Sequence, residues 1–180
     1  MEKAKVNYVD EVYRGKSFSF VVEDITLPNG KRTAFPTIRH PGSTGIVPFA
    51  TDGSVVMTCQ YRHAVGEYLL EIPAGTLEKG ESPVACARRE LEEETGFVAQ
   101  ELIEIAVVHI LPAYSDEKIY VYLARGLQPS RQHLDEDEII RVVNYPLEHL
   151  LQLIRKGAIT DALTILALYQ AQMYLQNPYS

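Results

Sequence analysis

The side chains best suited to chemistry are gathered between residues 75 and 97, where glutamates and an arginine recur at helical spacing. Glu90 and Glu94 are four residues apart, so a helix places both carboxylates on one face, and Glu93 borders that face. Arg89 precedes Glu93 by four residues and is expected to pair with it. Crowded carboxylates repel one another unless a cation lies among them, and Mg²⁺ prefers oxygen ligands and substrate phosphates. The spacing therefore predicts a divalent-cation site on a helix.

Residues that begin and end helices flank these glutamates. Ser82 suits the N-cap, and Pro83 suits the first helical position, where its missing N–H costs nothing. Gly96 suits the left-handed position directly after a helix. The apolar stripe expected to face the core consists of Val84, Ala87 and Leu91.

The whole segment resembles the Nudix box, G-x5-E-x7-R-E-U-x-E-E-x-G-U, in which U is a bulky aliphatic or aromatic residue. Every specified position matches, at Gly75, Glu81, Arg89, Glu90, Leu91, Glu93, Glu94, Gly96 and Phe97. The acids gather at the C-terminal end of the expected helix, where the helix dipole disfavours them. An arrangement that costs stability indicates a function rather than a solvated surface helix.

The resemblance implies a role for most of these side chains. The expected metal ligands are Glu90, Glu94, Glu138 and the backbone carbonyl of Ala74. The metal is expected to be Mg²⁺, with Mn²⁺ as a possible replacement, and Glu93 is a further catalytic carboxylate. Glu81 and Arg89 are expected to order the box rather than to hold metal or phosphate.

A general base must come from outside the box, because the box carboxylates are committed to the metal. An acidic run at 135–138 precedes an expected strand, and a late acidic loop in similar ADP-ribose enzymes supplies the base and a metal ligand. The resemblance therefore implies Glu136 as the base and Glu138 as the ligand. Glu117 is the alternative base.

Further features resemble the ADP-ribose pyrophosphatases and their nucleotide-sugar relatives. They are residues 60–62 (Gln-Tyr-Arg), 71–75 (Glu-Ile-Pro-Ala-Gly), Pro112, 115–117, and 157–162. The chain departs from that pattern at Ala113, where the family often has Gly, and at Leu163, where it often has Lys.

Three residues are expected to contact the substrate. Arg62 can bind a phosphate through its guanidinium fork, Tyr114 can stack on a base, and Pro112 belongs to the same expected site. Tyr114 also matches a tyrosine of dinucleoside polyphosphate hydrolases, which keeps that substrate class open.

Composition favours a cytoplasmic enzyme with a small-molecule substrate. The net charge of −7 over 180 residues argues against binding to nucleic acid or to an anionic membrane. No apolar run approaches the roughly 20 residues needed to span a bilayer, and the N-terminal residues lack the apolar stretch of a signal peptide. Cys59 and Cys86 are expected to be small core residues rather than a disulfide or a metal pair.

We expect an α/β fold with two parts. Residues 43–180 should form the Nudix α/β/α sandwich with a mixed sheet, and residues 1–42 a small antiparallel sheet with a hairpin at Asn29–Gly30. A sheet this small cannot bury its own apolar side chains, and similar enzymes use this region to pair subunits, so a homodimer is expected. Expected strands lie at 46–50, 54–61, 68–72, 102–110, 118–124 and 139–145, and expected helices at 146–156 and 160–175.

The leading hypothesis is Mg²⁺-dependent hydrolysis of the diphosphate of ADP-ribose to AMP and ribose 5-phosphate. The alternatives within enzymes are other nucleoside diphosphate-sugars and dinucleoside polyphosphates. The alternative from another class is a non-catalytic nucleotide-binding regulator on the Nudix fold. The intact box argues against that last alternative, because a binding module does not need every carboxylate.

Overall fold

The computed structural model describes residues 2–134 and 138–177. It divides the chain into two compact units. The small unit comprises Met1–Gly42 and His109–Lys118, and the large unit comprises Ser43–Val108 and Ile119–Ser180. The expected division after residue 42 places 109–118 in the second part, whereas the structure groups this segment with the first.

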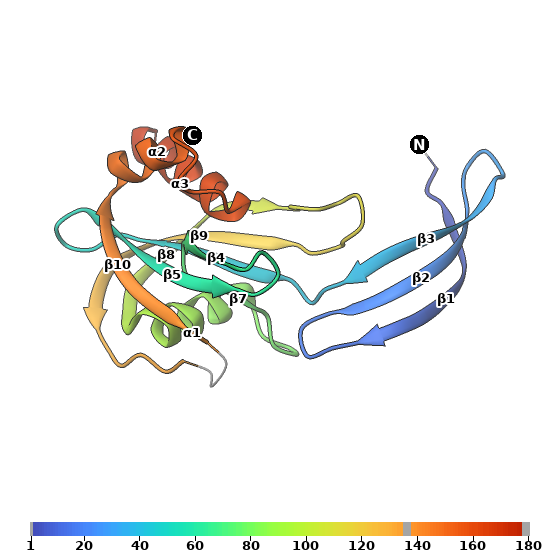
Figure 1. Ribbon diagram of the computed structural model, residues 1–180, viewed down its shortest axis with the longest axis horizontal. Helices are drawn as coiled ribbons and strands as arrows, with labels where there is room; N and C mark the ends of the chain where they lie inside the picture. The colour runs from blue at the N-terminus through green and yellow to red at the C-terminus, as the bar shows by residue number, and fades with distance from the viewer. Residues whose placement is uncertain (1, 135–137, 178–180) are drawn as a thin grey trace. The chain divides into compact units, whose positions relative to one another are not determined.

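The small unit is built on a three-stranded antiparallel sheet in the order β1–β2–β3 (Figure 1). Its strands are β1 (Lys5–Arg14), β2 (Ser19–Thr26) and β3 (Arg32–Arg39). The expected hairpin is present between β2 and β3, where Gly30 has a φ of 81° that an L-residue rarely adopts. Every residue of β1 is exposed, whereas β2 alternates and buries Val21, Glu23 and Ile25.

The large unit contains two sheets. One is antiparallel in the order β10–β5–β6, and the other has the order β7–β4–β9–β8 with β4 and β9 parallel. The strands are β4 (Ser43–Pro48), β5 (Ser54–Arg62), β6 (Glu67–Glu71), β7 (Ala74–Thr76), β8 (Phe97–Val108), β9 (Ile119–Pro129) and β10 (Ile140–Pro146), and the helices are α1 (Pro83–Thr95), α2 (Leu147–Arg155) and α3 (Ala162–Gln176).

Helices cover the sheets of the large unit on two sides, with α1 on one side and α2 with α3 on the other (Figure 1). Ala87 and Leu91 of α1 pack with Ile46 of β4, and a second, larger core cluster lies with α2 and α3. The structure confirms the predicted α/β fold with its small N-terminal antiparallel sheet. None of the helices in the described part of the chain is long and apolar enough to cross a membrane.

The short strand β7 was not predicted. Its sequence, Ala74-Gly75-Thr76, carries no apolar alternation, and it becomes a strand because its backbone pairs with β4, Gly45 opposite Ala74. This pairing places the start of the box at the edge of the mixed sheet, beside β4.

Candidate active site

Helix α1 begins and ends as its sequence predicts. The Ser82 hydroxyl accepts from the Ala85 amide at 3.3 Å, and Gly96 takes the left-handed conformation with a φ of 71°. The expected buried stripe is only partly right, because Val84 is 40% exposed. In the second turn Cys86 is buried beside Ala87. The buried residues of α1 are Cys86, Ala87, Glu90, Leu91, Glu94 and Thr95.

The buried stripe of α1 therefore includes two carboxylates. Glu94 is only 3% exposed, and one of its oxygens accepts from the Ala74 amide of β7 at 3.0 Å. The Glu90 carboxyl occupies the space beside Gly75, since a Cβ placed on Gly75 would lie 1.8 Å from Glu90 Cδ. The first glycine of the box is thus required by the position of the Glu90 carboxylate.

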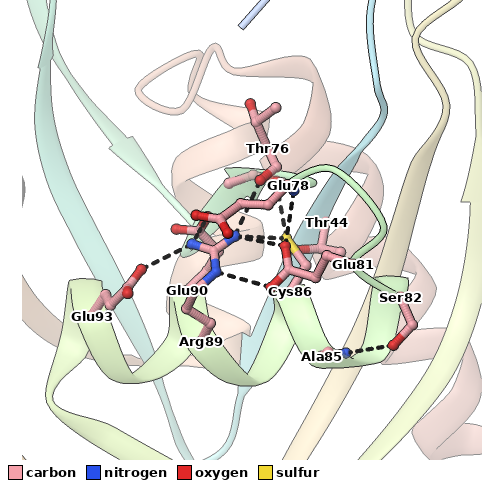
Figure 2. A network of polar contacts seen from close by, with 11 residues as sticks. Thr44, Thr76, Glu78, Glu81, Ser82, Ala85, Cys86, Arg89, Glu90 and Glu93 are labelled. Atoms are coloured by element: carbon pink, nitrogen blue, oxygen red, sulfur yellow. Dashed lines mark hydrogen bonds and ion pairs between the residues drawn. The ribbon is translucent and has the colours of Figure 1, made fainter. Parts of the chain in front are cut away.

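Arg89 binds three carboxylates of the box at once (Figure 2). Its Nε and Nη2 donate to the two oxygens of Glu81 at 3.0 and 2.9 Å. Its Nη1 donates to Glu90 at 2.6 Å and to Glu93 at 2.9 Å, the partner expected from the sequence. Nη2 also donates to the carbonyl of Thr76. Arg89 and Glu81 therefore join the loop before α1 to the helix.

Burial and like charge act together on the two buried carboxylates. Burial, helped by the negative charges of Glu93 and Glu138, raises the pKa of Glu90 to about 7 against the opposing effect of Arg89. Burial also raises the pKa of Glu94 well above its usual range, with further raising by Glu90 and Glu138. Glu138 thus lies within electrostatic range of both carboxylates.

These residues fit a divalent cation. Glu90 and Glu94 on one helix face would supply carboxylate oxygens, the donors that Mg²⁺ prefers, and the expected ligands Glu138 and the Ala74 carbonyl would add two more oxygen donors. A cation there would also offset the charge repulsion that raises both pKa values. Among the described residues, no three acidic, His or Cys side chains are already grouped in metal-binding geometry. Glu90 is instead bonded to Arg89, and Glu94 to Ala74.

Glu71, the first residue of the 71–75 segment, holds Arg62, a pairing that was not expected from the sequence. Arg62 donates from Nε to both oxygens of Glu71, at 3.1 and 3.0 Å, and from Nη2 at 2.7 Å. Glu71 is only 5% exposed. The charges of Glu94 and Asp161 also act on Arg62. Arg62 is therefore within electrostatic range of the box carboxylate Glu94, and two of its nitrogens donate to Glu71.

The connection that follows β9 is bonded to the C-terminal end of α1. The Ser130 amide donates to the Gly96 carbonyl at 2.7 Å, the Gln132 side chain to the Glu94 carbonyl at 2.6 Å, and the His133 amide to the Glu93 carbonyl at 2.9 Å. These bonds were not expected from the sequence, because the partners are far apart along the chain. They hold residues 130–133, which precede the acidic run, against the C-terminal end of the box helix. Glu136, the expected base, lies outside the described residues.

The other expected site residues, Pro112, Tyr114 and Glu117, belong to the small unit. Pro112 and Tyr114 are exposed, and Glu117 is half-buried. The Tyr114 carbonyl accepts from the Ile38 amide at 2.7 Å, so its backbone is fixed while its ring stays accessible.

Both cysteines are free of disulfides, as expected, with Cys86 buried and Cys59 half-buried. Burial raises the pKa of Cys86 to about 12, so its sulfur is a thiol and not a thiolate at neutral pH. The Thr44 hydroxyl lies 3.4 Å from that sulfur.

The buried acids, their arginine and the flanking glycines are the parts of one known class of domain. The NUDIX domain model matches residues 39–167, and the chain therefore belongs to the Nudix family.

Individual relatives show which members of the family the chain is similar to. The chain is 37% identical to the ADP-ribose pyrophosphatase of Bacillus subtilis (strain 168), covering 91% of this chain and 90% of that one. It is 35% identical to the methanol dehydrogenase activator of Bacillus methanolicus, with the same coverage. Among solved structures it resembles an ADP compounds hydrolase, with a TM-score of 0.86, 26% identity, and 99% and 97% of the two chains covered. Over most of its length the chain is therefore similar to Nudix proteins named as ADP-ribose pyrophosphatases.

Proposed function

We propose that the protein hydrolyses the diphosphate of ADP-ribose, with Mg²⁺, to AMP and ribose 5-phosphate. The observation that carries this proposal is the pair of buried carboxylates, Glu90 and Glu94, on one face of α1. Relatives named ADP-ribose pyrophosphatase support the choice of substrate.

The ligands proposed for the cation are Glu90, Glu94, Glu138 and the carbonyl of Ala74. A cation bound by them would neutralise the diphosphate oxygens and activate water for attack.

Arg89 keeps Glu90 and Glu93 in place through its hydrogen bonds. Arg62, fixed by Glu71, presents its remaining N–H groups to a substrate phosphate. Glu136 takes the proton from the attacking water, and Glu117 is the alternative base. Tyr114 and Pro112 contact the nucleoside.

A substrate panel tests this proposal. The purified protein is incubated with ADP-ribose, a GDP-sugar or a dinucleoside tetraphosphate, each with Mg²⁺, Mn²⁺ or a chelator, and the products are separated. We expect AMP and ribose 5-phosphate from ADP-ribose as the fastest reaction, and none with the chelator. Faster turnover of either other substrate would move the assignment to that class.

We propose further that the protein is a homodimer that pairs through its small unit. Strand β1 exposes Val6, Tyr8, Val9, Val12 and Tyr13, and apolar groups exposed together on a strand indicate an interface. Val21 of β2 is already buried within the small unit, so it needs no partner surface. Light scattering at micromolar concentration should give about twice the 20.2 kDa chain mass.

A second candidate is a regulatory role toward a dehydrogenase, favoured by the 35% identity to the methanol dehydrogenase activator. If regulation were independent of catalysis, Glu94→Gln would still stimulate a purified methanol dehydrogenase. Loss of both activities in Glu94→Gln would make hydrolysis the cause of any stimulation.

A further inference from the structure

The segment His109–Lys118 is bonded to β3 through its backbone. The Ile38 amide donates to the Tyr114 carbonyl at 2.7 Å, and the Asp116 amide donates to the Ile38 carbonyl at 3.2 Å. Ile38 and Ser115 form an isolated parallel bridge. The segment that carries Pro112, Tyr114 and Glu117 thus adds to the edge of the N-terminal sheet.

Arg39 reinforces this junction with its side chain. Its Nη2 donates to Glu23 at 2.6 Å, and its Nη1 donates to Asp116 at 2.8 Å. Asp116 also accepts from the His40 amide at 2.9 Å, and Glu23 also accepts from the Thr37 hydroxyl. One guanidinium therefore bridges a buried acid of β2 to an acid of the 109–118 segment.

The geometry of this bridge requires arginine. The guanidinium is planar and presents separate N–H groups to two carboxylates, whereas a lysine ammonium is a compact point charge. Glu23 is 8% exposed, so removing its cation would leave a nearly buried carboxylate without its charged partner. Burial raises the pKa of Asp116, but the bonds from Arg39 and the His40 amide outweigh that effect and hold this pKa below its ordinary value. Asp116 is thus a carboxylate at neutral pH.

We propose that Arg39 is a positioning residue, which holds the 109–118 segment on the N-terminal sheet in the conformation that presents Tyr114 and Glu117 to the substrate. This inference rests on the proposed function. It gives the N-terminal sheet a role beyond pairing subunits, because the sheet becomes the support of a substrate-contacting segment. Arg39 itself touches no reacting atom in this role.

Three measurements on Arg39→Gln test the inference. Hydrogen exchange read by mass spectrometry follows amide protection in a peptide that covers 109–118. Steady-state kinetics with ADP-ribose separate KM from kcat, and a Mg²⁺ titration follows metal use. The matched control is Arg32→Gln, which breaks an Asp24 ion pair on the same sheet without touching the segment.

We expect Arg39→Gln to speed exchange in 109–118 about tenfold and to raise KM about tenfold, the size of one charge-assisted hydrogen bond. The Mg²⁺ requirement and exchange in α1 should stay unchanged, and Arg32→Gln should change none of these values. Arg39→Lys should recover only part of the protection, since it keeps the charge without the fork. Asp116→Asn provides a second variant that removes the same ion pair if Arg39→Gln fails to fold.

Several outcomes would overturn the inference. Exchange in 109–118 that is unchanged in both Arg39→Gln and Asp116→Asn shows that the ion pair does not hold the segment. Faster exchange with an unchanged KM shows that the segment does not serve the substrate. An equal rise in KM for Arg32→Gln shows that general destabilisation of the N-terminal sheet, and not loss of the Arg39–Asp116 ion pair, raises KM. If the wild type does not cleave ADP-ribose, the proposed function fails, and the exchange measurement still decides whether Arg39 holds the segment.

Discussion

Helix α1 buries charged side chains, whereas strand β1 exposes apolar ones. The box helix turns Glu90 and Glu94 toward the interior, where charged carboxylates are costly without a counter-charge. Strand β1 turns valines and tyrosines toward solvent, and all ten of its residues are exposed. Buried charge indicates a cation, and exposed apolar surface indicates another protein surface. The comparison thus separates the part of the chain suited to catalysis from the part suited to association.

The largest effect should come from the buried acids. Glu94→Gln keeps the size of the side chain but removes its charge, so turnover should fall by about 10³-fold while the fold is retained. Glu92→Gln is the matched control, because Glu92 lies on the same helix outside the buried stripe. Circular dichroism checks the fold and product formation checks turnover. Activity within about threefold of wild type at saturating Mg²⁺ would exclude Glu94 as a ligand.

The next effect separates the two candidate bases. Glu136→Gln should lower kcat by about 10²–10⁴-fold, the usual contribution of a general base, with little change in metal affinity. Glu138→Gln should instead raise the Mg²⁺ concentration needed for half activation, since Glu138 lies in electrostatic range of Glu90 and Glu94. If Glu136→Gln keeps wild-type activity while Glu117→Gln is inactive, the general base lies in the 109–118 segment instead.

A smaller effect is expected from β1. Val12→Asp places a charge among the exposed apolar side chains, so it should weaken dimerisation by at least about tenfold. Asp10→Asn on the same strand is the control, because it keeps the size and polarity of the side chain and places no new charge among the apolar groups. Sedimentation over a concentration series measures the equilibrium. A Val12→Asp protein that dimerises like wild type would move the interface away from β1.

The smallest effect concerns stability without metal. Because the pKa of folded Glu90 is raised to about 7 from its ordinary 4.5, its contribution is full below pH 4.5 and is lost as the pH rises through 7. In chelator, the melting temperature should therefore fall between pH 5 and 7.5, by the equivalent of about 1–3 kcal/mol. Glu90→Gln should flatten this slope, and Mg²⁺ should reduce it. A slope that is equal in wild type and Glu90→Gln would contradict the burial of this charge.

Local structure could be predicted from the sequence because neighbours within one turn decide it. Ser82 and Gly96 mark the ends of α1, and the Arg89–Glu93 pair follows from their spacing. The same spacing places Glu90 and Glu94 on one face. Val84 was the exception, because a periodic stripe does not show how much of the first turn the sheet covers.

Tertiary structure alone decided the contacts between distant segments. Arg39 and Asp116 are 77 residues apart, and Gln132 meets the Glu94 carbonyl across 38. Strand β7 exists because β4 offers it backbone partners. Such contacts depend on strand register and on which segment reaches a sheet edge, and these are set by packing of the whole chain. By itself the sequence therefore determined the box helix and the placement of Glu90 and Glu94 on one of its faces, whereas the contacts that support Arg62 and the 109–118 segment required the fold.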